Sequence, residues 1–229
     1  MSRTLTRVTP LAAPESASFG YAWDYLGRMS AIVYPDGEEL RYGYDYGGQI
    51  KSVTGRHHGL TTNYVADIAY DEFGQRTYIE YGNGARTSYA YDESRRWLDT
   101  IRTESGSRVL QDMRYSFDAV GNVLGYDNRA GSYATSQRYA YDGLYQLVRA
   151  EGTTTKREYG LIDYESRYSQ DFRFDEIGNL IEKASRHTVS PKKEIGDELN
   201  YTLGYSYYEG KSRQAERIGD IYYRYDLNG

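Results

Sequence analysis

A short motif recurs along the whole chain and constrains its fold more than any other feature. It consists of two aromatic residues two positions apart, an Asp directly after the second, usually a Gly three positions later, and then a polar and an apolar residue. Tyr115–Val123 and Tyr139–Leu147 are two copies. The Asp of the motif is Asp24, Asp45, Asp71, Asp92, Asp118, Asp142, Asp175 or Asp226, and Tyr208 takes its place in a degenerate copy. A period of roughly 20–50 residues indicates a repeat architecture.

Each part of the motif favours a strand, a tight turn and a returning strand. Aromatic residues two positions apart point to the same face of a strand, because side chains alternate between the faces. An Asp followed three residues later by Gly is typical of a type I turn, in which the Asp side chain accepts N–H groups of the turn. We therefore interpret the motif aspartates as structural turn caps, and expect neither a catalytic nor a metal-binding role for them.

A second set of turns lies between the motifs. Tyr34–Gly37 contains Pro-Asp-Gly, Tyr81–Gly84 contains Gly-Asn-Gly, and Ser105 and Gly106 separate two further alternating segments. Asp-Gly and Asn-Gly pairs between alternating segments are strong hairpin signals. The sequence therefore predicts an all-β fold of repeated antiparallel hairpins in a curved or spiralling sheet, or in a small barrel.

The domain organisation follows from where the repeats begin and where they loosen. Residues 1–18 are expected to be a partly ordered leader or an edge strand, limited by Pro10 and Pro14. Residues 19–229 form the repeat body, interrupted by a polar loop at about 186–200 that is either solvated or a contact for a partner. Because the chain reaches Gly229 inside a motif, we expect a fragment of a longer protein, whose truncated sheet favours edge-to-edge self-association.

Composition narrows the classes of function. The chain has 28 tyrosines, so the sheet must bury Tyr in place of aliphatic residues, and a face lined with Tyr suits a cavity wall or a binding surface. The net charge is −5, with no long basic run, which argues against a nucleic-acid partner. Without cysteine there are neither disulfides nor cysteine metal sites, and no apolar segment approaches the ~18 residues of a membrane span.

Candidate catalytic residues are sparse. His57 and His58 are neighbours that would face opposite ways in a strand, and His187 falls in the expected polar loop, so all three are interpreted as surface residues. No nucleophile, zinc or phosphate-binding motif is present, and no cofactor or metal is expected. A glycosidase would need two facing carboxylates, for which Glu80, Glu158 and Glu182 are candidates that nothing in the spacing favours.

The repeated motif resembles the YD repeats of Rhs proteins, of the C components of insecticidal toxin complexes, and of teneurins. The family's motif ends its turn with Gly, a polar residue and an apolar residue, and this pattern is present at Gly27–Met29, Gly121–Val123 and Gly178–Leu180. Two copies depart from it, since Asp92–Arg95 lacks the Gly and Tyr208 replaces the Asp. The resemblance implies a hollow β-shell that in bacterial toxins encloses a toxic domain. Many members also cleave themselves near an Asp-Pro motif, which this chain lacks, so no protease residue is carried over.

Two functions follow as expectations. The first is a non-catalytic segment of a secreted or cell-surface shell that encapsulates or presents a toxin or effector domain, with the rest of a larger polypeptide or its cargo as partner. The second is an adhesion module that binds cell-surface carbohydrate through exposed aromatic rings. For the second function, Trp23 and Trp97 are the candidates for stacking on a sugar.

Overall fold

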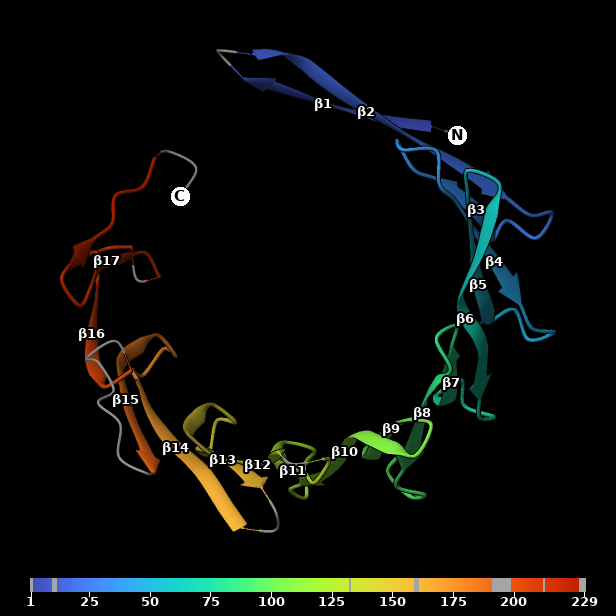
Figure 1. The fold of residues 1–229 in the computed structure, drawn as a ribbon. Coiled ribbons are helices and arrows are strands. Elements are labelled where there is room, and N and C mark those ends of the chain that lie inside the picture. The colour runs from blue at the N-terminus through green and yellow to red at the C-terminus, as the bar shows by residue number, and fades with distance from the viewer. Residues whose placement is uncertain are drawn as a thin grey trace. The chain divides into compact units, whose positions relative to one another are not determined.

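In the computed structural model the chain consists of strands and turns (Figure 1). The structure describes residues 2–9, 12–131, 133–158, 161–190, 199–211 and 213–226. Across these residues there are strands β1 to β18 and no helix, and hence no helix that could span a membrane. The strands group into two compact units, residues 1–90 with 101–110, and residues 91–100 with 111–229.

The first unit is built from successive hairpins. Its strands are β1 (Ser2–Thr9), β2 (Ala12–Trp23), β3 (Met29–Val33), β4 (Glu39–Tyr44), β5 (Ile50–His57), β6 (Leu60–Tyr70), β7 (Arg76–Tyr81) and β8 (Ala85–Tyr91). Each is antiparallel to the next. The predicted turns at Tyr34–Gly37 and Tyr81–Gly84 are confirmed, because the last Gly of each donates its N–H to the carbonyl of the first residue at 2.9 Å.

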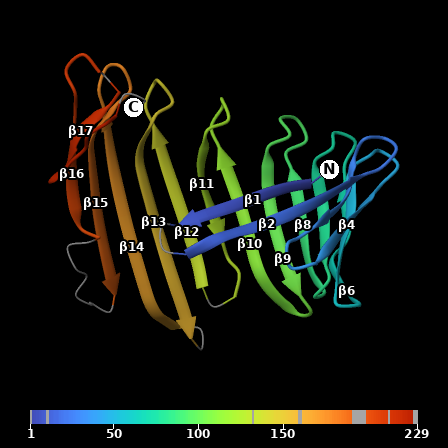
Figure 2. The same cartoon turned by 90° about the horizontal axis from the view of Figure 1, so that it is seen from above.

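The second unit continues the same pattern after β9 (Leu98–Ser105) and β10 (Arg108–Phe117), the hairpin whose tip lies at the predicted Ser105–Gly106 turn. Its further strands are β11 (Val123–Asn128), β12 (Tyr133–Tyr141), β13 (Leu147–Glu158), β14 (Leu161–Phe174), β15 (Leu180–Ser190), β16 (Tyr201–Tyr207), β17 (Ala215–Ile218) and β18 (Ile221–Tyr222). Figure 2 shows β11 to β16 side by side in chain order. The predicted all-β fold of repeated antiparallel hairpins is confirmed.

A β-bulge precedes the motif turn in each copy whose strand register is described. Tyr139 pairs with Ala150 and Ala140 with Arg149, but the next pair is Tyr141 with Leu147, so one residue of β13 is skipped. The same shift occurs at Trp23, Tyr44, Tyr70, Phe117, Phe174 and Tyr207. A bulge re-aims a side chain and increases the local twist. Here it acts on the second aromatic residue of every motif in which the pairing register is known.

The strands present two different faces. One row across four strands of the second unit contains Tyr139, Ala150, Gln170 and Ser185, and includes two of the few buried residues of the chain. We call the side of the motif aromatics, to which this row belongs, the aromatic face. No large side chain in the described part of the chain is fully buried. Within the described residues, the aromatic face is therefore only partly buried.

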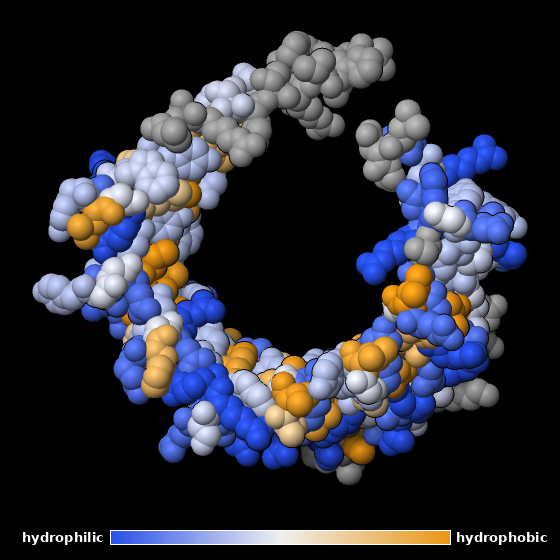
Figure 3. All heavy atoms as spheres, turned by 180° about the vertical axis from the view of Figure 1, so that it is seen from behind, coloured by the Kyte–Doolittle hydropathy of each residue, from blue (hydrophilic) through white to orange (hydrophobic). Residues whose placement is uncertain are grey.

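The opposite side carries charged residues and is called the charged face. The neighbouring row contains Arg138, Glu151, Ser169 and Arg186. Ion pairs cross the strands here, between Arg138 and Asp127 at 2.9 Å and between Arg149 and Asp171 at 2.7 Å. Figure 3 shows hydrophilic residues over most of the visible surface, with hydrophobic ones in small groups. Exposed pairs of this kind add ~0–1 kcal/mol each and chiefly keep this side solvated.

The structure extends the strand ladder at two places where the sequence suggested interruption. Residues 2–9 and 12–18 form paired strands, and the pairing is irregular beyond Arg7 and Glu15, next to Pro14, which has no N–H to donate. The expected polar loop at 186–200 begins later, because β15 stays paired with β14 up to Ser190. Residues 191–198 of that loop lie outside the described residues.

Candidate functional site: the repeated turn and its tyrosine contacts

The turn at Asp118 illustrates the geometry that the motif builds. The carboxylate Oδ1 of Asp118 accepts the N–H groups of Val120 and Asn122, both at 2.9 Å. The backbone N–H of Asp118 donates to the Asn122 carbonyl at 3.0 Å, which closes the turn. Gly121 has a φ of 99°, which an L side chain rarely adopts. Asp118 thus supplies the acceptor for the N–H groups of the turn, and Gly121 supplies the positive φ.

The same hydrogen bonds recur along the chain. Oδ1 accepts N–H groups two and four positions on at Asp24, Asp71, Asp142 and Asp175, and the N–H four positions on at Asp45, all within 3.0 Å. Asp92 accepts from Ser94 and Arg95. Asp226 is followed by residues 227–229, which lie outside the described residues, so the turn expected there is not described.

The second carboxylate oxygen explains the polar residue after the Gly. Oδ2 of Asp118 accepts the Asn122 amide at 2.8 Å, Oδ2 of Asp175 the Asn179 amide at 2.8 Å, and Oδ2 of Asp24 the Arg28 guanidinium at 2.7 Å. An ionised carboxylate accepts with both oxygens, and such bonds are stronger than neutral ones. In these three turns, a donor side chain four positions after Asp thus engages the second carboxylate oxygen.

These bonds lower the pKa of the motif carboxyls. For Asp24 the largest cause is the backbone N–H of Arg28, and the Arg28 side chain lowers the pKa further. For Asp118 and Asp175, burial raises the pKa, but the hydrogen bonds from Asn122 and Asn179 outweigh it, so the net pKa falls below 3.8. The charged form is favoured because its lone pairs are already paired with donors.

The polar side chain of one turn also packs on the next turn along the chain. The Arg28 guanidinium lies 4.2 Å from the ring centre of Tyr44 and near Gly48. A Cβ added to Gly74 would approach the Gln49 amide within 2.8 Å, and one added to Gly178 would approach the Gln146 amide within 3.0 Å. The Gly of each of these turns thus provides both a positive φ and space for the preceding repeat.

A tyrosine hydroxyl joins consecutive repeats. The second aromatic residue of the motif donates its O–H to the carbonyl of the first apolar residue after the preceding turn. The pairs are Tyr44 to Met29 at 2.6 Å, Tyr70 to Ile50 at 2.8 Å, Tyr141 to Val123 at 2.9 Å and Tyr207 to Leu180 at 2.8 Å. Burial raises the pKa of Tyr70 and Tyr207, so the O–H remains protonated at neutral pH.

The predictions from the sequence do not include these hydroxyl contacts. They state only that the two aromatic residues of a motif share one face of a strand. A signal was present, because the second aromatic position is Tyr in most copies, whereas a purely apolar site would accept Phe as well. Phe117 and Phe174 occupy it in two copies and have no hydroxyl. At these two positions the contact cannot form.

Two copies keep the turn without Gly. Tyr145 stands at the Gly position of the Asp142 turn with a φ of 63° and is 61% exposed. The turn after Asp92 is one residue longer, since the Asp92 N–H donates to Trp97 O at 2.8 Å and not to the residue four positions on. Arg96 takes the positive φ there, at 62°. A third departure, at Tyr208, is a longer turn in which the Tyr208 N–H donates to Gln214 O at 3.1 Å.

The two tryptophans occupy different surroundings. Trp23 is 52% exposed at the end of β2. Trp97 is half-buried. The centre of its ring lies 5.2 Å from the ring centre of Phe117 and 4.7 Å from the guanidinium of Arg95. Only Trp23 therefore offers a largely open ring for stacking on a sugar, and binding by either residue stays a proposal.

His57 and His58 lie at a hairpin tip. His57 ends β5 and His58 lies in the turn with a φ of 48°, so the alternation expected of two neighbours within one strand does not apply to them. Their ring centres are 4.0 Å apart. The prediction that His187 lies in a loop is wrong. It lies in β15, where its Nε2 is 2.6 Å from the Ser166 hydroxyl.

Two of the three acidic candidates lie in ion pairs within the described residues. Glu80 pairs with Arg86 at 3.0 Å, and Glu182 lies 3.6 Å from Arg173. The side chain of Glu158 lies outside the described residues. Within the described ranges, no group of three or more His, Asp or Glu residues is arranged to hold a metal ion.

The recurring turn, its bulge and its tyrosine contact can be compared with known proteins. Toxin subunit YenC1 of Yersinia entomophaga is 35% identical over 153 residues, and toxin subunit YenC2 of the same organism is 32% identical over 174 residues. These similarities confirm the predicted resemblance to the Rhs/YD-repeat family. The aligned parts cover 54% and 64% of this chain but only 15% and 17% of these relatives, and no protein-family model matches the chain.

Solved structures agree on the fold of this chain. The crystal structure of TcdB2-TccC3 matches with a TM-score of 0.72 and 22% identity, over 90% of this chain and 11% of that one. The crystal structure of TcdB2-TccC3 without its hypervariable C-terminal region matches with a TM-score of 0.75, also at 22% identity, over 93% of this chain and 11% of that one. This chain thus corresponds to a short segment of much longer chains with the same fold.

Proposed function

We propose that this chain is a non-catalytic stretch of the wall of a secreted or cell-surface YD-repeat shell that encapsulates or presents a toxin or effector domain. The observation that carries the proposal is the chain of hydroxyl contacts between repeats, typified by Tyr141 and Val123. A wall one sheet thick has no second layer to hold it, so its stiffness has to come from contacts between neighbouring hairpins. Similarity to toxin subunits YenC1 and YenC2 supports the shell role.

The two faces of the strands also support a wall. The charged face carries ion pairs that suit water, such as that between Arg138 and Asp127. The aromatic face is half-buried and keeps polar tyrosine tips, which suits contact with the rest of a larger polypeptide or with its cargo. The partner is therefore expected on the aromatic face.

Protease protection tests the proposal. The full-length polypeptide that contains this chain is digested as wild type and with Tyr44, Tyr70 and Tyr141 all replaced by Phe. We expect the enclosed segment to resist cleavage in the wild type and to be cut sooner in the variant, whose wall has lost three contacts between repeats. A matched control replaces Tyr25 and Tyr46, which are exposed in their turns, by Phe. Equal cleavage of wild type and variant contradicts the proposal.

Adhesion to carbohydrate is the alternative proposal, and the exposed ring of Trp23 supports it. An aromatic ring can stack on the apolar face of a sugar, and Trp23 is 52% exposed. A glycan array probed with wild type and with Trp23→Ala tests this function. Binding that is lost in Trp23→Ala favours adhesion, and no binding to any glycan leaves the wall as the only proposed role.

A further inference from the structure

The copy of the motif that departs most from the repeat also builds a pocket in the second unit. The turn from Asp92 to Trp97 has one extra residue, and Trp97 stands where other repeats have Arg, Gln or Asn. Its extra length places Arg96 at a φ of 62°, a conformation that strains a non-glycine residue. Tyr145 has a similar φ of 63° in its own turn, so it is the extra residue and the Trp that distinguish the Asp92 copy.

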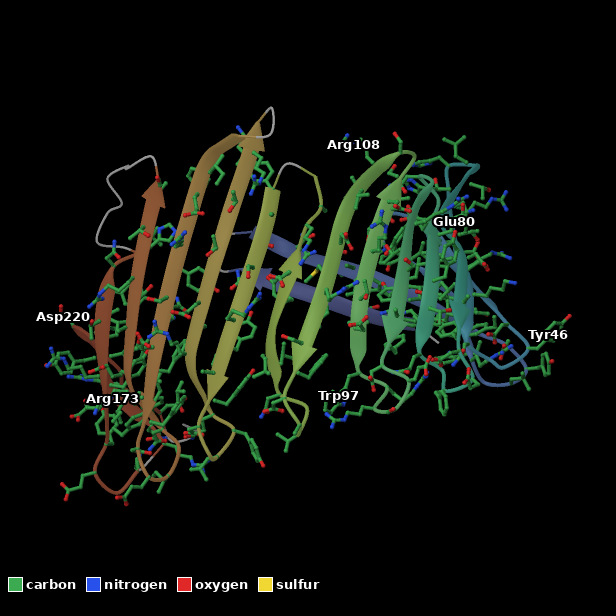
Figure 4. All side chains as sticks on the ribbon, turned by 90° about the horizontal axis from the view of Figure 1, so that it is seen from below. Tyr46, Glu80, Trp97, Arg108, Arg173 and Asp220 are labelled. Carbon is green, nitrogen blue, oxygen red and sulfur yellow. The ribbon has the colours of Figure 1, made fainter. Side chains whose placement is uncertain are left out.

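The pocket has a volume of about 240 Å³ and is lined by aromatic rings and carboxylates. Trp97, Phe117 and Tyr115 form the aromatic part, with ring centres 5.2 Å apart for Trp97 and Phe117 and 6.5 Å apart for Tyr115 and Phe117. Asp92 and Asp99 also line it. Figure 4 shows Trp97 at the turn end of its strand. The volume lies below the ~300–1,000 Å³ of sites for drug-sized ligands, so it suits one small group.

The pocket already holds a cation. The guanidinium of Arg95, which also lines the pocket, lies 4.7 Å from the centre of the Trp97 ring, within the ~6 Å of a cation–π contact. The Arg95 backbone is anchored, since its N–H donates to Asp92 Oδ1 at 2.6 Å, but its residue as a whole is exposed. The guanidinium is therefore free to swing away while the turn stays closed.

The two carboxylates make the pocket selective for positive charge. Asp92 uses Oδ1 for the turn, and Asp99 accepts the Thr100 hydroxyl with Oδ2 at 2.9 Å. Each carboxylate thus has a second oxygen beyond its hydrogen bonds within the described chain. Aromatic rings beside carboxylates attract guanidinium and ammonium groups, because both the ring faces and the oxygens carry negative potential.

We propose that this pocket, the Trp97 pocket, binds the guanidinium or ammonium group of an arginine or lysine side chain from a partner polypeptide segment, and that Arg95 is an internal substitute which that group displaces. The residues that line the pocket include two aspartates and one arginine. The lining therefore carries an excess of negative charge, which favours an incoming cation. The proposal does not depend on the shell function.

Fluorescence of Trp97 measures the binding directly. In the 229-residue chain with Trp23→Phe, Trp97 is the only tryptophan. The probe is N-acetyl-arginine amide, the control probe is N-acetyl-citrulline amide, which is neutral and has nearly the same shape, and glucose serves as a neutral sugar. We expect a saturable change with the arginine probe and none with the other two.

Two further variants identify the site. Arg95→Ala removes the internal competitor and is expected to tighten binding of the arginine probe about two- to fivefold, the range of an exposed cation–π contact. Asp99→Asn keeps the shape but removes one charge, and is expected to weaken it. Far-ultraviolet circular dichroism confirms that each variant is folded. Binding of citrulline as tight as that of arginine, saturation with glucose alone, or no saturation in folded Arg95→Ala overturns the proposal.

A peptide distinguishes a polypeptide partner from a free metabolite. A short peptide with one central Arg is compared with the same peptide carrying citrulline and with the single amino-acid probe. We expect the Arg peptide to bind more tightly than the amino-acid probe, because flanking residues contact the neighbouring aromatic face. Equal affinity of peptide and amino-acid probe contradicts a polypeptide partner.

Discussion

The hydroxyl of Tyr141 donates a hydrogen bond of 2.9 Å to the backbone carbonyl of Val123, 18 residues earlier and in the preceding repeat. The carbonyl belongs to the first residue of β11, directly after the Asp118 turn. The pairing of β12 with β13 shifts at Tyr141, and a bulge of this kind re-aims side chains. One side chain thus joins the start of β11 to the following repeat.

The first prediction concerns this contact. Tyr141→Phe should lower the free energy of unfolding by about 0.5–1.5 kcal/mol, because the Val123 carbonyl loses its partner while the ring packing is kept. Tyr25→Phe is the matched control and should change nothing, since Tyr25 is 93% exposed. Thermal unfolding followed by circular dichroism measures both variants. An equal effect of the two substitutions contradicts the role of the hydroxyl.

The reverse substitution gives a second prediction. Phe174 occupies the position of Tyr141 in its own repeat, and Leu147 stands where Val123 does. Phe174→Tyr should therefore add a hydroxyl contact to the Leu147 carbonyl and raise the melting temperature by about 2–4 °C, the shift that ~1 kcal/mol causes in a domain of this size. A lower melting temperature would mean that this carbonyl is not accessible to a hydroxyl.

Much of the repeat could be predicted from sequence because its signals are local. The pairing of Asp with a later Gly identifies the turn, and the two-residue spacing of Tyr139 and Tyr141 identifies the strand. The structure places Tyr139 in the row of Ala150 and brings Leu147 opposite Tyr141. These features depend on residues within one hairpin, so a single motif contains the information.

The features that the sequence does not predict depend on residues far apart in the chain or on rare backbone conformations. The contact from Tyr141 to Val123 joins residues 18 positions apart, and it lies beside a bulge whose position the alternation of side chains does not reveal. Strand β15 continues past His187, against the expected loop, because β14 pairs with it as far as Ser190. Pairing of this kind is decided by the neighbouring strand.

The third prediction concerns the turn that uses Tyr in place of Gly. Tyr145→Gly should raise the free energy of unfolding by up to about 1 kcal/mol, because a φ of 63° strains Tyr but not Gly. Gly27→Ala is the converse, since Gly27 has a φ of 76° and its added Cβ would meet nothing within 4 Å. It should be destabilising by a similar amount, through backbone strain alone. Urea denaturation with unchanged m-values measures both.

The fourth prediction concerns the motif aspartates, which we propose to be turn caps. Asp118→Ala should lower the melting temperature by about 2–4 °C and leave the strand content intact, because Val120, Asn122 and the Asn122 amide lose one acceptor group. Circular dichroism gives both quantities. Loss of an enzymatic or metal-dependent activity in this variant, with the fold unchanged, would contradict a purely structural role.

The fifth prediction follows from the lowered pKa of Asp24, Asp118 and Asp175. A carboxyl whose pKa is lower in the folded state stabilises the protein above its unfolded value of 3.8, and this contribution is lost as the pH falls through the folded pKa. The melting temperature should therefore change little from pH 7 to pH 5 and fall below about pH 4. The double variant Asp118→Asn with Asp175→Asn should be less stable at pH 7 and lose less on acidification. If the melting temperatures of the wild type and the double variant fall equally on acidification, groups outside these turns cause the acid sensitivity.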